Sequence, residues 1–135
     1  MSSSGYSGTP LAKKLSLKPG LRAWFDGMPG SVRDELGSLG LVELASPAAP
    51  LDAAHIFVTA RADMEAKLTT LRPLLASSGF IWVSWPKKAS KVPTDITEGG
   101  IREVILPGTD LVDVKVCAVD AMWSGLKLMI RRERR

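Results

Sequence analysis

The sequence predicts a three-layer α/β domain whose sheet is mostly parallel and ends in an antiparallel hairpin. Continuous apolar runs at residues 53–60 and 80–85 are typical of strands that helices cover on both faces. Segments with helical spacing alternate with these runs, which is the order of a doubly wound sheet. Residues 111–119 and 126–132 instead alternate apolar and polar side chains. That pattern favours two half-exposed antiparallel strands at one side of the sheet.

An arm and a predicted docking helix occupy residues 1–20. Thr9 is the expected helix cap, and a Lys-Pro-Gly sequence is the expected stop, because proline and glycine cannot continue a helix. Leu11 and Leu15 stand four residues apart, so one face of the helix can pack against the domain. The predicted α/β domain itself spans residues 21–135 and is long enough for one apolar core.

Two short strands and a helix follow the arm. Residues 21–25 form the first predicted strand, and residues 26–30 form the turn after it. Ser31 is the expected cap of a helix that ends at Gly40. Residues 41–44 form the second predicted strand, and two closely spaced prolines after it predict a loop.

The most regular predicted helix lies between the two buried strands, at residues 61–79, and Gly79 is its expected end. Four apolar side chains carry its helical spacing: Met64, Leu68, Leu71 and Leu75. After the second buried strand, Thr94 or Asp95 is expected to cap another helix over residues 96–106.

Composition places the chain among ordinary globular domains, with 45% apolar and 24% charged residues. No apolar run approaches the roughly 18 residues that span a bilayer, and the first residues lack the pattern of a signal peptide. One cysteine and one histidine argue against a disulfide framework and a structural zinc site. We therefore expect a cytoplasmic protein without a bound metal.

The net charge of +4 is unevenly distributed. One basic group is the lysine loop, defined here as Lys87, Lys88 and Lys91, and another is the basic tail at residues 131–135. The simpler interpretation of each group is a solvated surface. The alternative is contact with an anion or with nucleic acid.

Residues 15–30, LSLKPGLRAWFDGMPG, and residues 51–86 resemble class I S-adenosylmethionine-dependent methyltransferases. The resemblance implies a methyltransferase-like, Rossmann-like fold with a glycine-containing cofactor loop after the first strand. A ribose-binding acid after the second strand is also implied. Four residues match these positions. Asp26, Gly27 and Gly30 match the cofactor loop, and Glu43 matches the ribose-binding acid.

The cofactor loop departs from the pattern of that family. Gly27 and Gly30 are three residues apart, and Met28 and Pro29 stand where backbone would approach a ligand. A strand-helix unit is also missing before the third strand. We therefore expect a degraded loop and no bound cofactor, with S-adenosylmethionine as the alternative. A water-facing carboxylate is the simpler interpretation of Glu43.

The chain also resembles a family of short bacterial proteins that share four segments: GYSGTPLAKKL, WVSWPKK, VDVKVCAVD and WSGLK. This resemblance implies a fold and no particular activity.

The carboxyl ends of the parallel strands predict where a ligand would bind. The strand at residues 80–85 ends in the lysine loop, so we expect a rim for an anionic ligand or a protein partner. Five residues form this predicted rim: Ser84, Trp85, Lys87, Lys88 and Thr94. Trp85 could stack on a planar ligand or pack beneath the loop.

No catalytic residue is predicted, because His55 and Cys117 lie within predicted strands and are expected to be core side chains. Three functions remain open. The first is a non-catalytic or catalytically reduced domain that binds a small anion or a protein. The second is an S-adenosylmethionine-dependent methyltransferase, or another enzyme, with an atypical cofactor loop. The third is a nucleic-acid-binding protein that uses the lysine loop and the basic tail.

Overall fold

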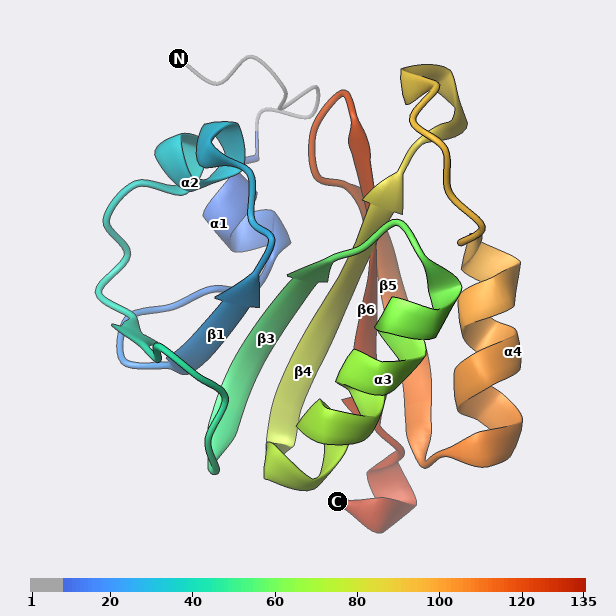
Figure 1. Ribbon diagram of the computed structural model, residues 1–135. Helices are drawn as coiled ribbons and strands as arrows, with labels where there is room; N and C mark the ends of the chain where they lie inside the picture. The colour runs from blue at the N-terminus through green and yellow to red at the C-terminus, as the bar shows by residue number, and fades with distance from the viewer. Residues whose placement is uncertain (1–8) are drawn as a thin grey trace.

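A six-stranded sheet forms the middle layer of the computed structural model, which describes residues 9–135 (Figure 1). The strands are β1 (Arg22–Asp26), β2 (Val42–Glu43), β3 (Leu51–Phe57), β4 (Leu75–Pro86), β5 (Leu111–Ala118) and β6 (Trp123–Ile130). The α-helices are α1 (Leu11–Lys14), α2 (Gly30–Leu36), α3 (Arg61–Leu71) and α4 (Glu98–Gly108). Short 3₁₀-helices are η1 (Arg72–Leu74), η2 (Lys88–Ser90) and η3 (Arg132–Arg134). None of these helices is long and apolar enough to cross a membrane.

The strand order across the sheet is β2-β1-β3-β4-β6-β5. β2, β1, β3 and β4 are paired in parallel, whereas β6 runs antiparallel to both β4 and β5. The two continuous apolar runs of the sequence became β3 and β4, which lie in the centre of the sheet. The predicted fold class, three layers with a mostly parallel sheet and a C-terminal antiparallel hairpin, is confirmed.

Helices cover both faces of the sheet and produce two apolar cores (Figure 1). Ile56, Ile81 and Trp85 are buried on the face that α3 and α4 cover. Phe80 and Trp82 are buried on the opposite face, beneath α1 and α2. The predicted placement of Trp82 and Trp85 on opposite faces is confirmed, because side chains an odd number of residues apart alternate across a strand.

The docking helix is shorter than expected. Leu11 and Leu15 are buried in the core beneath α1 and α2, as predicted. However, α1 is a single turn whose N-cap is Pro10, with no side-chain cap, so the prediction that Thr9 caps it is wrong. The part of the arm before Thr9 lies outside the described residues.

The ends of α2 and α3 differ from the predictions. Pro29, not Ser31, is the N-cap of α2. α3 ends at Leu71 and continues only as the short η1, and β4 then begins well before the predicted strand. Gly79 lies within β4 and does not end a helix. A Cβ at Gly79 would lie 2.7 Å from the carbonyl oxygen of Leu51, so glycine allows β3 and β4 to approach closely at an irregularity in their pairing.

Neither predicted residue caps α4. Its N-cap is Thr97, whose Oγ1 accepts from the backbone N–H of Gly100 at 2.9 Å. Thr94 instead donates through Oγ1 to the carbonyl oxygen of Thr59 at 2.6 Å. Asp95 accepts from the backbone N–H of Arg61, at the start of α3, at 2.6 Å. Both side chains therefore tie this segment to the end of β3 and the beginning of α3, which no local pattern before α4 could indicate.

The basic tail folds back on the domain. Arg131 donates through Nη2 to the carbonyl oxygens of Leu106 at 3.0 Å and Thr109 at 3.3 Å. Arg135 donates through Nε to the carbonyl oxygen of Ile130 at 2.7 Å. These two guanidinium groups thus bind carbonyl oxygens near the ends of α4 and β6.

Candidate functional site

The carboxyl ends of β1, β3 and β4 lie along one edge of the sheet (Figure 1). Ligands of open parallel sheets bind at this edge. The β4–α4 pocket lies at this edge, between the end of β4 and the start of α4. A second pocket, the α2–β2 pocket, lies beside β1 and β2, between α2, the loop that follows α2, and the end of β2.

The loop of residues 26–30 turns sharply after β1. Gly27 has a φ of 70°, and a Cβ there would lie 3.0 Å from the carbonyl oxygen of Phe57 at the end of β3. Glycine is therefore required both by the backbone conformation and by the close approach of β3. At Gly30 the space that a Cβ would occupy is open, so the loop backbone can be approached from that side.

Asp26, the first residue of this loop, faces α3. Its carboxylate forms an ion pair with Nζ of Lys67, which also lies 2.9 Å from Oδ2 of Asp63. Burial alone would lower the pKa of Lys67, but hydrogen bonds to the two carboxylates raise it. The predicted cofactor-loop acid thus neutralises a lysine of α3.

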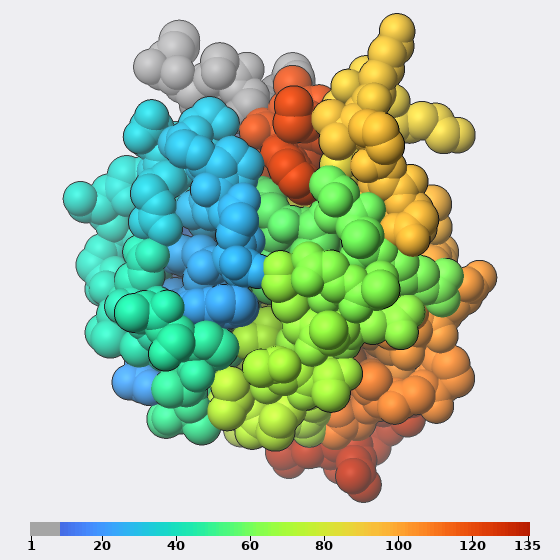
Figure 2. Space-filling model, in the orientation of Figure 1, coloured from blue at the N-terminus to red at the C-terminus, as the bar shows by residue number. Residues whose placement is uncertain are grey.

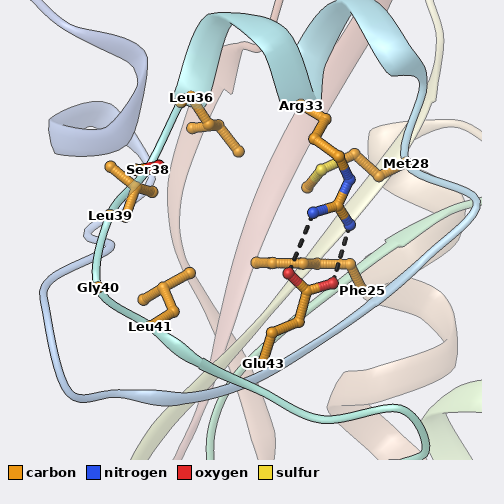
Figure 3. A pocket seen from close by; sticks show the side chains of 10 residues that line it. Phe25, Met28, Arg33, Leu36, Ser38, Leu39, Gly40, Leu41 and Glu43 are labelled. Carbon is orange, nitrogen blue, oxygen red and sulfur yellow. Dashed lines mark hydrogen bonds and ion pairs between the residues drawn. The ribbon is translucent and has the colours of Figure 1, made fainter.

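The α2–β2 pocket has a volume of about 260 Å³ (Figure 3). Phe25 and Met28 border it from β1 and its loop, so the bulky methionine of the loop forms a pocket wall. Its remaining lining residues come from α2, the following loop and β2: Arg33, Leu36, Gly37, Ser38, Leu39, Gly40, Leu41 and Glu43. The walls are mixed polar and apolar, and the charged groups are Arg33 and Glu43.

Arg33 and Glu43, which both line this pocket, form a bidentate ion pair (Figure 3). Nη1 of Arg33 lies 3.0 Å from Oε1 of Glu43, and Nη2 lies 2.9 Å from Oε2. The guanidinium also lies over the ring of Phe25, 5.8 Å from its centroid. The hydrogen bonds from Arg33 lower the pKa of Glu43, so the carboxylate is ionised at neutral pH. Both side chains remain about half exposed, at 52% and 43%.

The β4–α4 pocket has a volume of about 450 Å³. Three residues of the predicted rim line it: Trp85, Lys88 and Thr94. Trp85 is only 8% exposed and packs in the core beneath α3 and α4, so it is both a core residue and part of the pocket floor.

Ser84 and Lys87 do not belong to this pocket. Ser84 is fully buried on the other face of β4, where its Oγ lies 2.7 Å from Nε2 of His55. The prediction that Ser84 lies on the rim is wrong, because it shares the inward-facing side of the strand with Trp82. The backbone N–H of Lys87 donates to the carbonyl oxygen of Met122, which joins this residue to the β5–β6 turn.

His55 is a core residue, as predicted. It is 2% exposed, its ring stacks on that of Phe57 with centroids 4.2 Å apart, and burial lowers its pKa to about 3. Burial also raises the pKa of the Cys117 thiol. Neither group is suited to act as a base or a nucleophile at the sheet edge. Among the described residues, no cluster of three or more His, Cys, Asp or Glu side chains could hold a metal ion.

Sequence reasoning missed several residues of both pockets. Arg33 was not singled out, because its contact with Glu43 depends on how α2 packs over β2. In the β4–α4 pocket, Val92, Pro93 and Ile96 were missed. Their apolar, proline-containing segment between two charged stretches was the available signal that this loop packs against the domain.

No protein-family model matches the chain, and a search of curated proteins finds no similar sequence. Solved structures, by contrast, include many with the same fold. A putative type 11 methyltransferase from Sulfolobus solfataricus superposes with a TM-score of 0.59 at 13% identity, covering 90% of this chain and 89% of that one.

Two further structures of this fold carry the cofactor. Aeropyrum pernix fibrillarin, with natively bound S-adenosyl-L-methionine, superposes with a TM-score of 0.57 at 12% identity. The superposition covers 93% of this chain and 71% of the fibrillarin chain. Magnesium protoporphyrin IX methyltransferase from Synechocystis PCC 6803, with bound S-adenosylmethionine, has a TM-score of 0.53 at 12% identity, with coverages of 90% and 74%.

These findings correct two expectations. The expectation of no cofactor is contradicted, since structures with this fold were solved with S-adenosylmethionine bound. The interpretation as a non-catalytic domain gains no support from neighbours described as methyltransferases, and nothing in the comparisons points to nucleic-acid binding. The similarity in structure, at identities far below those of close relatives, establishes that this chain has the methyltransferase-like Rossmann fold.

Proposed function

We propose that this protein binds S-adenosylmethionine at the α2–β2 pocket and acts as a methyltransferase with an atypical cofactor loop. The observation that carries this proposal is the position of Glu43. Its carboxylate lies at the end of the second strand and lines a pocket of mixed polar and apolar character that Met28, from the loop after β1, also lines. In dinucleotide-binding Rossmann folds, an acid at the end of the second strand binds ribose hydroxyls.

The residues of the pocket fit the nucleoside part of this cofactor. Phe25, Met28 and Leu41 offer apolar surface to a purine ring, and Glu43 offers two acceptor oxygens to hydroxyl groups. The open space at Gly30 lets a ligand reach the backbone of the loop. The side chain of Glu43 is about half exposed, so a ligand can reach its carboxylate.

Arg33 does not prevent such binding. Both members of its ion pair with Glu43 are about half exposed, so water already competes for their hydrogen-bonding groups and weakens the pair. A hydroxyl group can therefore replace one of the two Arg33–Glu43 hydrogen bonds at small cost. Arg33 would then hold the other carboxylate oxygen and keep Glu43 pointed at the ligand.

When bound, S-adenosylmethionine supplies a methyl group on a positively charged sulfur. The chain's own contribution is to hold the nucleoside and to orient it at the sheet edge. His55 cannot accept a proton from a substrate, because it is buried in the core with its pKa lowered to about 3. The proposed transfer therefore relies on positioning, which is a large part of catalysis in bimolecular reactions.

Titration calorimetry with S-adenosylhomocysteine, the product that S-adenosylmethionine leaves after methyl transfer, tests this proposal. We expect saturable binding to the unaltered protein and affinity about tenfold lower for Glu43→Gln, because hydrogen bonds to a charged acceptor contribute roughly 1.5–3 kcal/mol. Asp34→Asn is the matched control, since Asp34 is exposed on α2 and does not line the pocket. Absence of binding at millimolar concentration, or equal losses in the two variants, would contradict the proposal.

A further inference from the structure

The β4–α4 pocket shares no lining residue with the α2–β2 pocket. It is enclosed by the end of β4, by the segment that carries the lysine loop, and by the first residues of α4. In Figures 1 and 2 this segment, coloured gold, rises from the end of β4 and projects from the molecule before the chain descends to α4. The volume of the β4–α4 pocket, about 450 Å³, lies within the usual range for small-molecule sites.

The lining of this pocket is mainly apolar. Trp85 and Ile96 are both buried and expose only small parts of their side chains. Pro86, Val92 and Pro93 complete the apolar lining. Together these side chains give the pocket an apolar surface against which the apolar body of a ligand can lie.

Two lysines supply the charge of the pocket. Lys88 and Lys91 both line it and are exposed. Within residues 9–135, no salt bridge joins either lysine to a carboxylate. Lys88 begins η2, and Lys91 follows its last residue. Lys91 has a left-handed backbone with a φ of 61°, so the chain turns sharply at the end of η2. Both lysines lie on the lining of the same pocket.

The turn that presents these lysines is held by its own hydrogen bonds. The backbone N–H of Lys91 donates to the carbonyl oxygen of Lys88 at 3.1 Å. Oγ of Ser90 donates to the carbonyl oxygen of Lys87 at 2.6 Å and accepts from the N–H of Val92 at 3.3 Å. The lysine side chains thus extend from a fixed turn.

The other polar groups of the pocket already have partners. Thr94 donates to Thr59, and Thr97 accepts from Gly100. The one carboxylate in the lining, that of Glu98, forms an ion pair with Arg102. The charge available to a ligand is therefore positive and comes from Lys88 and Lys91.

We propose that the β4–α4 pocket binds a flat apolar molecule that carries one anionic group. Its apolar body lies over Trp85, and its carboxylate, phosphate or sulfonate contacts Lys88 and Lys91. Two lysines beside an apolar pocket match a small amphipathic anion better than an extended polyanion, which would need a longer row of cations. The proposal does not depend on nucleoside binding at the α2–β2 pocket.

Naphthalene-2-sulfonate and its uncharged counterpart 2-naphthol are suitable probes for calorimetry or NMR titration. We expect the sulfonate to bind saturably, and its affinity to fall about tenfold or more in Lys88→Met/Lys91→Met, because the variant removes both charged hydrogen-bond donors to the anion. Methionine keeps most of the apolar stem and removes the charge. Weak binding of 2-naphthol should be unchanged by the same double variant.

Lys87→Met is the matched control, since Lys87 is adjacent in sequence and does not line the pocket. It should bind the sulfonate like the unaltered protein. Thermal unfolding of all variants checks that the fold is intact. The proposal is wrong if the sulfonate does not saturate, if Lys87→Met weakens it as much as the double variant, or if only a single-stranded oligonucleotide shows binding that depends on Lys88 and Lys91.

Discussion

Lowering the pH from 7 to 4 is expected to reduce the free energy of unfolding by about 3 kcal/mol through His55 alone. The side chain is 2% exposed, and burial lowers its pKa from 6.5 to about 3. Below about pH 6.5 the unfolded chain therefore binds a proton that the folded protein excludes. The stabilisation is complete above the unfolded pKa and is lost as the pH falls towards the folded pKa.

Urea unfolding at pH 7, 5 and 4 measures this effect in the unaltered protein and in His55→Gln. Glutamine can keep a hydrogen bond to Ser84 but does not titrate, so the variant should lose about 3 kcal/mol less between pH 7 and 4. Carboxylates contribute equally to both proteins and cancel in the comparison. As a second readout, the NMR signals of the His55 imidazole in the folded protein should not titrate above about pH 4. A titration midpoint near pH 6.5 would contradict the lowered pKa of His55.

Replacement of Trp82 by alanine is expected to lower the free energy of unfolding by about 3–5 kcal/mol, the range for large aromatic side chains in cores. Trp82 is 1% exposed in the core beneath α1 and α2. Its Nε1 also donates to the carbonyl oxygen of Leu15 at 2.9 Å, which ties the end of the docking helix to the centre of β4. Both the cavity and the lost hydrogen bond contribute to the expected effect.

Trp82→Phe separates these two contributions. Phenylalanine fills most of the volume but leaves the buried carbonyl of Leu15 without its donor, at a cost of about 1–3 kcal/mol. Hydrogen exchange should show lower protection of amides in residues 11–17. Trp85→Phe, on the opposite face of the same strand, is the control and should leave that protection unchanged. Equal loss of protection in both variants would show that the Trp82–Leu15 bond does not hold α1.

The order and faces of the central strands were predictable from the sequence because burial on both faces leaves continuous apolar runs. The end of α3 was not predictable in the same way. Leu75 continued the helical spacing, yet it pairs with Leu51 in the sheet. Gly79, expected to end the helix, instead allows β3 and β4 to approach closely. Pairing between distant strands overrode a local periodicity.

The candidate site was predictable in part. Strand ends of a parallel sheet placed Trp85 and Lys88 at the edge, and the resemblance to methyltransferases pointed to Glu43. Each of the three lines a pocket. Alternation along β4 should have assigned Ser84 to the core with Trp82. The Arg33–Glu43 pair and the convergence of Lys91 with Lys88 depend on helix packing and on a 3₁₀ turn, and neither leaves a pattern in the sequence.

The most direct test of nucleoside binding at the α2–β2 pocket is an amide NMR titration of the ¹⁵N-labelled protein with S-adenosylhomocysteine. The proposed function predicts saturable shifts at Gly27, Gly30 and residues 39–43, with residues 88–98 little affected. No shift at millimolar ligand, or shifts confined to residues 88–98, would contradict it.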